Sequence, residues 1–363
     1  MGKTDIEYLR KRLIKWYQAN QRDLPWRRSS NPYHIWVSEV MLQQTQVNTV
    51  LSYYRRFIKA FPSIKRLSQA DLQSVLKIWE GMGYYARARN LHRAAQRISQ
   101  HHGGRIPDTW DAFHSLPGVG DYIAAAVLSI AFERPYAVVD GNVKRVLARL
   151  HKISAPVNQS QSYSHFKSAA DTLLDVKQPG TFNQAVMELG ALICKPRNPE
   201  CDACPLNQLC RAYQTRQVAH FPKRQKRTAT PQYHIAVGVV FKNDRVLITQ
   251  RRPEGLLGGL WEFPGGKIRD GESSRAACIR EIKEEVNLQV EIDRHLTQVK
   301  HAYTHFKIVM EVFCCQYVSG RVYLRGPQAF RWIRLAEYKN YPFPRANHKF
   351  IPLLKEMADS SVP

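Results

Sequence analysis

Four cysteines fall within 17 residues of the chain, with the spacing C-x6-C-x2-C-x5-C: Cys194, Cys201, Cys204 and Cys210. Four thiolates so close in sequence can wrap one inorganic centre, and both zinc and a four-iron cluster accept four of them. The spacing favours iron slightly, because zinc sites more often come as paired C-x2-C knuckles. Pro205 directly follows the third cysteine and cannot extend a helix there. The run therefore predicts a metal-binding loop, for zinc or for iron.

The other three cysteines show no ligand spacing and are expected to be ordinary buried thiols: Cys278, Cys314 and Cys315. Seven cysteines without a secretory signal argue against a disulfide framework. The opening residues MGKTDIEYLRKRL are charged, and no stretch approaches the roughly 18 consecutive apolar residues of a membrane span. We expect a soluble, cytosolic protein with no membrane partner.

The 363 residues include 54 lysines and arginines against 30 aspartates and glutamates, a formal net charge of +24. Residues 1–216 carry +14 of it and residues 217–363 carry +10, so both parts are basic and neither is a charged tail. A merely soluble basic protein is one interpretation, but the charge favours a polyanionic partner, most simply nucleic acid. With 44% hydrophobic residues and this length, a disordered chain is excluded and two or three domains are expected.

The spacing of apolar residues changes once along the chain. Up to residue 216 they recur at three and four, which predicts an all-α domain over 1–216. Residues 217–231 are basic, contain two prolines and have little to bury, which predicts a linker. Residues 232–363 predict an α+β domain with a helix and four strands, at 273–286 and at 235–241, 246–249, 307–317 and 320–324.

Two turns in the helical part are candidate sites. In Leu116-Pro-Gly-Val-Gly120, the glycines Gly118 and Gly120 expose N–H groups that can hold a phosphate. Asp121 is expected to cap the alanine-rich helix that follows, although the turn is equally compatible with a simple helix connector. Asp140 lies at the start of another helix, where the dipole and free N–H groups keep a carboxylate ionised. The alternative for Asp140 is an ordinary N-cap.

The hairpin, Asp140 and the cysteine run, in this order and at these separations, resemble the helix-hairpin-helix DNA glycosylase superfamily. Three further motifs resemble its adenine DNA glycosylase (MutY) branch: Ser38–Val47 (SEVMLQQTQV), Gly81–Asn90 (GMGYYARARN) and Phe182–Gln184 (FNQ). The resemblance covers nearly all of residues 1–216. It implies excision of adenine mispaired with 8-oxoguanine, or with guanine, in base excision repair, and a [4Fe–4S] cluster held by the four cysteines.

Cleavage of an N-glycosidic bond requires protonation of a poor leaving base and stabilisation of an oxocarbenium-like sugar, so two carboxyl groups with separated pKa values are expected. By the resemblance, Glu39 is the acid, with its pKa raised by an apolar setting, and Asp140 stays anionic under the sugar. From the residues alone, a solvated helix face shared with Gln43 and Gln46 is the favoured interpretation of Glu39. Tyr122 stands where strand-cleaving relatives carry a Schiff-base lysine; a phenol forms no imine, which implies a monofunctional glycosylase.

The remaining DNA contacts follow from the resemblance. Gln44 and Tyr84 match positions whose side chains enter the base stack when the adenine leaves it. Three residues match the lining of the adenine pocket: Trp26, Arg27 and Gln184. Gly118, Gly120 and Asn142 are also expected to contact the substrate. Four basic residues are expected either to clamp the phosphate backbone or to lie on solvated helix faces: Arg87, Arg89, Lys144 and Arg145.

The α+β domain contains a segment, Trp261–Leu288, that resembles the Nudix box. Within its helix, three glutamates at i, i+3 and i+4 converge on one face suited to Mg²⁺ and a diphosphate: Glu281, Glu284 and Glu285. A charged helix surface is the alternative interpretation. The one departure from the box is Asn287, which stands where a glycine is usual.

Recognition of the damaged base is the main role expected of this domain. His301–His305 resembles the motif with which MutY proteins touch 8-oxoguanine, with Tyr303 and Thr304 where phenylalanine and serine are usual, followed by His305. The net charge of +10 suits DNA better than a free nucleotide. As an alternative, the box together with Phe343–Asn347 resembles MutT pyrophosphohydrolases, which implies additional Mg²⁺-dependent hydrolysis of 8-oxo-dGTP.

Two further alternatives are another helix-hairpin-helix glycosylase, of the endonuclease III or thymine-mismatch type, and a DNA-binding scaffold without catalysis. The first is disfavoured by Gln43-Gln44-Thr45 and by the appended Nudix-like domain. The expected partner is double-stranded DNA that contains adenine opposite 8-oxoguanine. The protein is expected to be a monomer in the bacterial cytoplasm, associated with the nucleoid.

Overall fold

The structure is a computed structural model that describes residues 2–226 and 229–360. The chain divides into two compact units, Met1–Gln69 with Arg93–Arg227 and Ala70–His92 with Thr228–Pro363. A piece of the helical sequence therefore groups with the C-terminal sheet. The sequence-based boundary in the linker 217–231 stays a prediction about which parts fold independently. In the part of the chain that the structure describes, no helix has the length and apolar composition that crossing a membrane requires.

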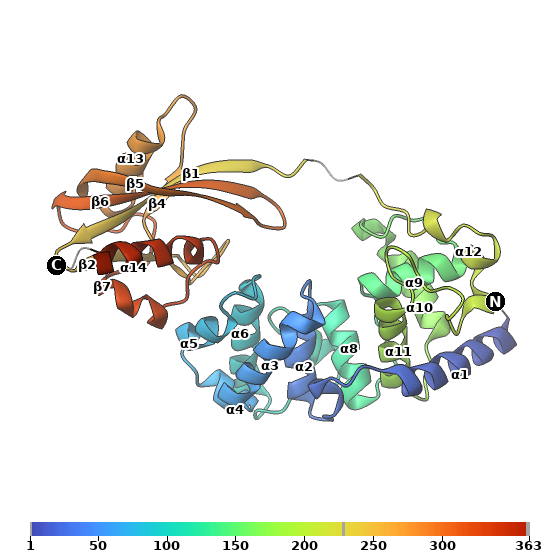
Figure 1. Cartoon of the computed structure of the whole chain (residues 1–363). Coiled ribbons are helices and arrows are strands. Elements are labelled where there is room, and N and C mark those ends of the chain that lie inside the picture. Colours follow the sequence, from blue (N-terminus) through green and yellow to red (C-terminus); the bar gives the residue numbers. More distant parts are fainter. Residues whose placement is uncertain (1, 227–228, 361–363) are drawn as a thin grey trace. The chain divides into compact units, whose positions relative to one another are not determined.

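The first unit is helical, as the spacing of its apolar residues predicted (Figure 1). Helix α6 (Ala86–His101) crosses the boundary between the units at residue 93. The other helices of the unit are α1 (Lys3–Asn20), α2 (Pro32–Leu42), α3 (Val47–Ala60), α4 (Ile64–Ser68), α7 (Trp110–His114), α8 (Asp121–Phe132), α9 (Gly141–His151), α10 (Tyr163–Leu173), α11 (Pro179–Leu192) and α12 (Arg211–Gln214).

Helices α2 and α8, which both contribute to the site, are largely buried. In α8 every residue from Ile123 to Ser129 is buried, as expected for a helix that is apolar on all sides. Helix α2 begins at the N-cap Asn31, whose side chain accepts a hydrogen bond from Tyr33 N at 2.9 Å, with Pro32 at the first helical position. Both α2 and α11 pack against α8.

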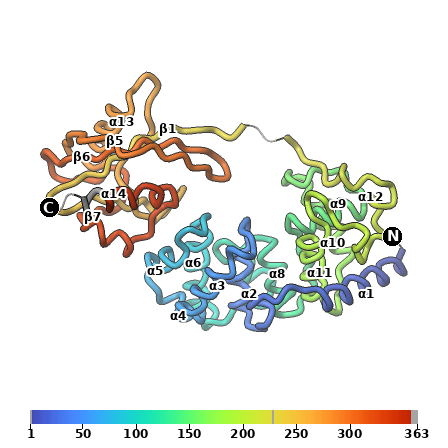
Figure 2. The backbone as a smooth tube through the Cα atoms, in the orientation of Figure 1, coloured from blue at the N-terminus to red at the C-terminus, as the bar shows by residue number. Residues whose placement is uncertain are grey.

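Helices α1, α9, α10 and α11 share one hydrophobic core. Helix α1 packs against α11, next to which it lies in Figure 2, and the core includes Leu13, Leu147, Phe166 and Leu189. Three of the four cysteines of the 194–210 run also pack against this core. The core therefore anchors the cysteine loop to α9 and α11.

The second unit is built on a mixed sheet with the strand order β3-β2-β1-β6-β5, in which β1 and β6 run parallel and the other pairs antiparallel. Strand β4 also pairs with β1, and β7 with β2. The elements of this unit are α5 (Leu72–Trp79), β1 (Gln232–Lys242), β2 (Arg245–Gln250), β3 (Trp261–Glu262), β4 (Gly265–Lys267), α13 (Ser274–Val286), β5 (Gln289–Ala302), β6 (Lys307–Ser319), β7 (Ala329–Arg334) and α14 (Ile351–Ser360).

Alternating residues of β1 serve the two faces of this sheet. Ala236 and Val240 pack with α13, whereas Val237 and Val239 pack with the segment around Phe343. Helix α13 lies very close to the sheet at Gly238, where an added Cβ would lie 2.5 Å from Ile282 Cδ1. The glycine therefore permits the contact between α13 and the central strand β1.

Most of the expected elements of this unit are confirmed, but one expected strand is absent, and β3, β4, β5, β7 and α14 were not predicted. Residues 320–324 are not a strand, because their backbone bonds to the end of α13: Tyr323 N donates to Val286 O at 3.1 Å. The 14-residue strand β5 was missed, since its exposed face is polar and its pairing with β6 supplies most of its contacts. The expectation that Cys278, Cys314 and Cys315 are buried free thiols is confirmed.

Candidate functional site

Glu39 on α2 is a buried carboxyl group with one close partner. It is 5% exposed, and the Tyr122 hydroxyl on α8 donates a hydrogen bond to its Oε2 at 2.5 Å. Burial raises the pKa of Glu39 to about 7; Tyr122 and Arg27 oppose the rise and Asp140 adds to it. The solvated helix face that the residues alone favoured is therefore wrong, because Glu39 lies in the interior.

Asp140 forms the N-cap of α9, the position predicted for it. Its Oδ1 accepts a hydrogen bond from Val143 N at 2.6 Å, and its Oδ2 accepts one from Asn142 Nδ2 at 3.0 Å. Burial raises the pKa of Asp140 above its usual range, whereas these two donors and Arg145 lower it. The N–H groups at the helix N-terminus lower the pKa of Asp140 as predicted, but desolvation, which the sequence did not reveal, raises it.

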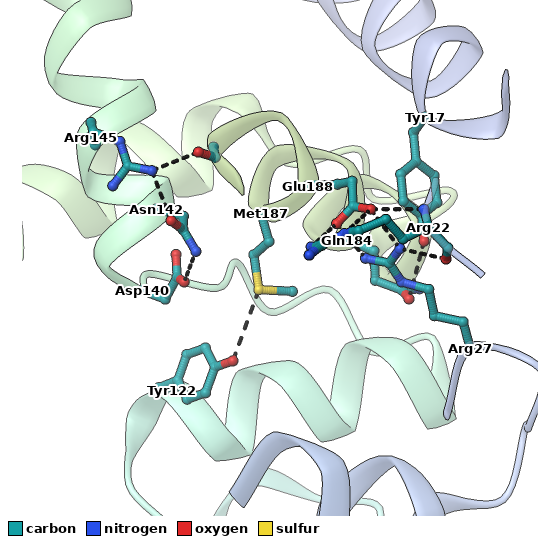
Figure 3. A network of polar contacts seen from close by, with 11 residues as sticks. Tyr17, Arg22, Arg27, Tyr122, Asp140, Asn142, Arg145, Gln184, Met187 and Glu188 are labelled. Atoms are coloured by element: carbon teal, nitrogen blue, oxygen red, sulfur yellow. Dashed lines mark hydrogen bonds and ion pairs between the residues drawn. The ribbon is translucent and has the colours of Figure 1, made fainter. Parts of the chain in front are cut away.

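A chain of hydrogen bonds connects Asp140 with the cysteine loop, and its part from Asp140 through Asn142 to Arg145 is seen in Figure 3. Asn142 Oδ1 accepts from Arg145 Nη2 at 2.8 Å, and Arg145 Nε donates to Cys194 O at 2.7 Å. Arg145 is 7% exposed, so the prediction of a phosphate clamp or a solvated face is wrong for this residue. Close packing against α11 also holds Asn142 in this chain of hydrogen bonds, since a Cβ at Gly190 would lie 2.7 Å from Asn142 Cβ.

One cavity of about 230 Å³ opens between α2, α8, α9, α11 and the turn Pro25–Arg27. Seven of the predicted site residues line it: Trp26, Arg27, Glu39, Tyr122, Asp140, Asn142 and Gln184. They come from segments far apart in the sequence, and only the fold brings them together. The volume is below that of a typical small-molecule pocket and suits one heterocyclic base.

An ion cluster that no motif had indicated forms one wall of the cavity. Glu188 on α11 is 1% exposed and accepts from Arg22 Nη2 at 2.6 Å and from Arg27 Nη2 at 2.8 Å (Figure 3). Although burial works to raise it, these arginines hold the pKa of Glu188 at about 2. Glu188 falls four residues after Gln184, on the same helix face, which is the signal that could have found it.

Aromatic and polar contacts hold the other walls in place. Trp26 packs edge-on against Tyr54, with ring centroids 5.2 Å apart. Gln184 Oε1 accepts from the Tyr17 hydroxyl at 3.3 Å, and the sulfur of Met187 lies 4.0 Å from the Tyr122 hydroxyl (Figure 3). Contacts with Tyr54, Tyr17 and Met187 thus fix the positions of the lining side chains Trp26, Gln184 and Tyr122.

The hairpin between α7 and α8 has the predicted form. Gly118 adopts φ +76°, and Gly120 is the N-cap of α8, with open space where a Cβ would point. The first N–H groups of α8 thus start at an exposed glycine, where an anion can approach. The prediction that Asp121 caps this helix is wrong: it lies in the first turn, and its Oδ1 bonds His114 Nε2 at 2.9 Å.

Gln44 and Tyr84, the residues expected to enter the base stack, share an uncommon backbone conformation. Gln44 has φ +56° and Tyr84 has φ +51°, a region that costs a non-glycine residue roughly 1–2 kcal/mol. Both side chains are exposed, Tyr84 to 36%. Strain of this kind at exposed residues is frequent at binding sites.

In the second unit, the expected lesion-reading motif forms the turn between β5 and β6. Thr304 and His305 are exposed at its tip. Tyr303 instead turns inward and stacks on Phe306, with ring centroids 4.7 Å apart. The Thr304 and Tyr84 hydroxyls are hydrogen-bonded, so two residues from separate motifs meet within this unit.

The four cysteines line one small cavity of about 30 Å³: Cys194, Cys201, Cys204 and Cys210. Arg149 on α9 is 3% exposed and donates from Nη1 to Cys194 Sγ at 3.3 Å, while its carbonyl oxygen accepts from Cys210 Sγ at 3.5 Å. A buried guanidinium beside these sulfurs offsets the negative charge that four thiolates bring to a cluster. The residues present therefore fit an iron–sulfur centre.

The three glutamates predicted to bind Mg²⁺ are on α13. Arg280 donates to Glu281 at 2.7 Å and to Glu284 at 3.0 Å. Glu285 instead lines a cavity of about 520 Å³, and burial raises its pKa to about 7. Within residues 2–226 and 229–360, no three side chains of the ligand-forming types are gathered for a single metal ion.

Asn287, the departure from the Nudix box, is the C-cap of α13 and adopts φ +58°. Asparagine is among the non-glycine residues that tolerate this conformation best. The substitution therefore preserves the backbone path that glycine gives at this position, and the departure does not disrupt the fold of the box.

Three family descriptions match parts of the chain. Residues 37–170 match the HhH-GPD superfamily of base excision DNA repair proteins, residues 194–210 the iron-sulfur binding domain of endonuclease III, and residues 236–353 the NUDIX domain. The cysteine loop is therefore an iron–sulfur site, which decides against zinc.

Two solved structures resemble the helical part. A thermostable thymine-DNA glycosylase is 29% identical, with a TM-score of 0.54 over 58% of this chain and 98% of that one. Endonuclease III in a non-covalent complex with DNA is 24% identical, with a TM-score of 0.51 over 60% of this chain and 98% of that one. The second likeness shows the fold alone.

Curated relatives match the chain nearly throughout. Adenine DNA glycosylase of Rattus norvegicus is 34% identical over 97% of this chain and 79% of its own length. The human protein is 34% identical over 92% of this chain and 72% of its own. One from Buchnera aphidicola subsp. Schizaphis graminum is 27% identical over 95% and 97%. With both domains matched in one relative, this chain belongs to the adenine DNA glycosylase family.

Proposed function

We propose that this protein excises adenine opposite 8-oxoguanine from duplex DNA, as a monofunctional glycosylase that carries a [4Fe–4S] cluster. As a member of its family it is a DNA N-glycosylase of base excision repair. The observation that carries the proposal is the single cavity lined by the buried Glu39 and the partly buried Asp140 together with Trp26, Arg27 and Gln184. The thymine-mismatch alternative is disfavoured by the full-length relatives, which are adenine glycosylases.

In the proposed reaction, adenine enters the cavity and Glu39 donates its proton to N7 of the base. The bond between N9 and C1′ then breaks, its electron pair leaves with the base, and water adds to C1′ and loses a proton. The Tyr122 hydroxyl occupies Glu39 Oε2 and thereby orients the carboxyl group, so that Oε1 serves the proton transfer. Asp140, beneath the sugar, stabilises the developing positive charge.

The four cysteines would hold the cluster, which would supply a rigid, charged centre beside α9. Arg145 and Arg149 bond the cysteine loop, and Arg145 also bonds Asn142, which bonds Asp140. We assign these residues the task of keeping Asp140 in place. Absorption and electron paramagnetic resonance spectra of the purified protein would establish the nuclearity of the cluster.

In the second unit we propose that Thr304 and His305, at the tip of the β5–β6 turn, read 8-oxoguanine in the strand opposite the adenine. Threonine keeps the hydroxyl of the usual serine, and the tip is exposed. The net charge of +24, spread over the whole chain, favours a DNA partner. From such a substrate we infer that the protein acts at the nucleoid in the cytoplasm. That it acts as a monomer stays a prediction.

Replacing Glu39 by Gln should lower adenine release by about 10²- to 10⁴-fold, because the amide has no proton to donate. Binding to a duplex with adenine opposite 8-oxoguanine should persist, since glutamine keeps the size of the side chain. Single-turnover release and a gel-shift titration measure the two effects. Glu7→Gln, an exposed charge loss on α1, serves as the control. Loss of binding together with catalysis would contradict the assignment.

The rate of adenine release should depend on pH through Glu39. An acid whose pKa is raised to about 7 is protonated below that pH, so the active form is present in acid and is lost as the pH rises. Single-turnover rates should therefore fall by about tenfold per pH unit above neutrality. A second fall at low pH is expected when Asp140 is protonated. A rate that stays constant between about pH 6 and about pH 9 speaks against Glu39 as the acid.

Replacing Tyr122 by Lys should add strand nicking, because it places an amine in the cavity where the sugar is expected. Covalent trapping with borohydride on DNA detects the Schiff base. Tyr122→Phe, which removes the hydroxyl and adds no nucleophile, should show no trapping. Efficient trapping of the wild-type protein would exclude a monofunctional glycosylase.

Mg²⁺-dependent hydrolysis of 8-oxo-dGTP is a second candidate function. It is favoured by the left-handed Asn287, which keeps the shape of the Nudix box, and by Glu285 and Asn347, which line the same cavity of about 520 Å³. The full-length protein incubated with 8-oxo-dGTP and Mg²⁺ should yield the monophosphate, and Glu285→Gln should not. If the wild-type protein forms no more monophosphate than the Glu285→Gln variant, this function is excluded.

A further inference from the structure

Helix α5 and the turn after it belong to the same compact unit as the C-terminal sheet, although their sequence lies within the helical domain. Side chains between residues 73 and 89 make several polar contacts with the C-terminal part of this unit. Gln73 Oε1 accepts from Trp261 Nε1 at 2.9 Å, Lys77 Nζ donates to Tyr341 O at 3.0 Å, and Arg89 Nη1 donates to Gly258 O at 2.8 Å. Arg89, expected to clamp DNA or to lie on a solvated face, is thus engaged inside the protein.

Glu80 is the carboxylate at the centre of this contact. It follows α5 directly, and its side chain is 15% exposed. Its Oε1 accepts from Phe343 N at 2.8 Å and from His348 Nε2 at 2.9 Å, and its Oε2 accepts from Lys77 Nζ at 2.6 Å. One side chain thus joins α5 to the segment 343–348.

The turn after Glu80 is tightly determined by its own contacts. Gly81 and Gly83 adopt φ +90° and +78°, and Trp79 Nε1 donates to Gly83 O at 3.1 Å. The Arg87 guanidinium lies 5.2 Å from the ring centroid of Tyr84 and 5.4 Å from that of Trp79. The position of Tyr84 therefore follows from the position of residues 79–83.

The far end of the turn meets the lesion-reading tip. The Tyr84 hydroxyl bonds Thr304 Oγ1. Residues 79–84 are thus connected to the C-terminal part of the chain at both ends, through Glu80 to the segment 343–348 and through Tyr84 to the β5–β6 turn. A shift of Glu80 would change the distance between the side chain that enters the base stack and the hydroxyl that reads the lesion.

We propose that Glu80 is a positioning residue for lesion recognition, which holds Tyr84 and Thr304 as one preassembled reader of 8-oxoguanine. The inference rests on the proposed function. It assigns to Glu80 the preference for 8-oxoguanine over guanine opposite the same adenine, and no part in the chemistry at Glu39. Preassembly matters because a reader that is already ordered loses less conformational entropy on binding.

The test compares full-length wild-type protein with Glu80→Ala, Glu80→Gln and the control Glu291→Ala, an exposed charge loss on β5. Single-turnover adenine release is measured on duplexes with adenine opposite 8-oxoguanine and opposite guanine. Glu80→Ala should lower the ratio of the two rates by about tenfold, because Phe343 N and His348 lose their acceptor. The rate opposite guanine should stay within about twofold. Glu80→Gln, which keeps an acceptor oxygen, should recover most of the ratio.

Equal loss on both duplexes, or a wild-type ratio in Glu80→Ala, overturns the inference. A wild-type protein without preference for 8-oxoguanine overturns the proposed function and the inference with it, whereas a wild-type preference that Glu80→Ala retains overturns the inference alone. If thermal unfolding shows that Glu80→Ala does not fold, His348→Gln replaces it and should lower the ratio in the same direction.

Discussion

Two carboxyl groups that line one cavity, Glu39 buried and Asp140 partly buried, are the constraint on which the helical unit depends. Desolvation raises the pKa of both Glu39 and Asp140. The charge of Asp140 raises the pKa of Glu39 further, whereas Arg145 and hydrogen-bond donors lower that of Asp140. The fold distinguishes the two by what it donates to them. Glu39 accepts one hydrogen bond from a phenol, whereas Asp140 accepts one from a backbone N–H and one from a side-chain amide at the start of α9. Two carboxyl groups in different environments are what acid catalysis with charge stabilisation requires.

Helix α9 links this pair to the iron–sulfur site. Asp140 caps it, and Arg145 and Arg149, four residues apart and therefore on one face, bond the cysteine loop. Both arginines are buried, which is costly unless every donor is used. Their partners are carbonyl oxygens, an amide oxygen and a thiol sulfur. The cysteine loop thus supports the N-terminal end of α9, and with it one side of the cavity.

Much of the site could be predicted, and the failures have common physical causes. Glu39, Tyr122, Asp140 and Gln184 do line one cavity, because each lies in a motif with its own local signal. Glu188, Arg145 and Glu80 were missed or misassigned because a charged residue in a helix looks solvated until packing buries it. The prediction that Asp121 caps α8 was wrong for another reason, because Gly120 precedes it and takes the N-cap position.

By itself the sequence determined the classes of the two domains, the cysteine loop and the box of the C-terminal domain, since each depends on residue types at short spacing. Glu39 and Asp140 were indicated as the candidate catalytic pair only through the resemblance to a family. Only the tertiary structure decided that Glu39 is buried, that Arg27 is held by Glu188, and that residues 70–92 pack with the C-terminal sheet. These properties depend on contacts between residues far apart in the chain. Burial and ion pairing between residues so far apart in the chain leave no periodic or local pattern in the sequence from which they could be predicted.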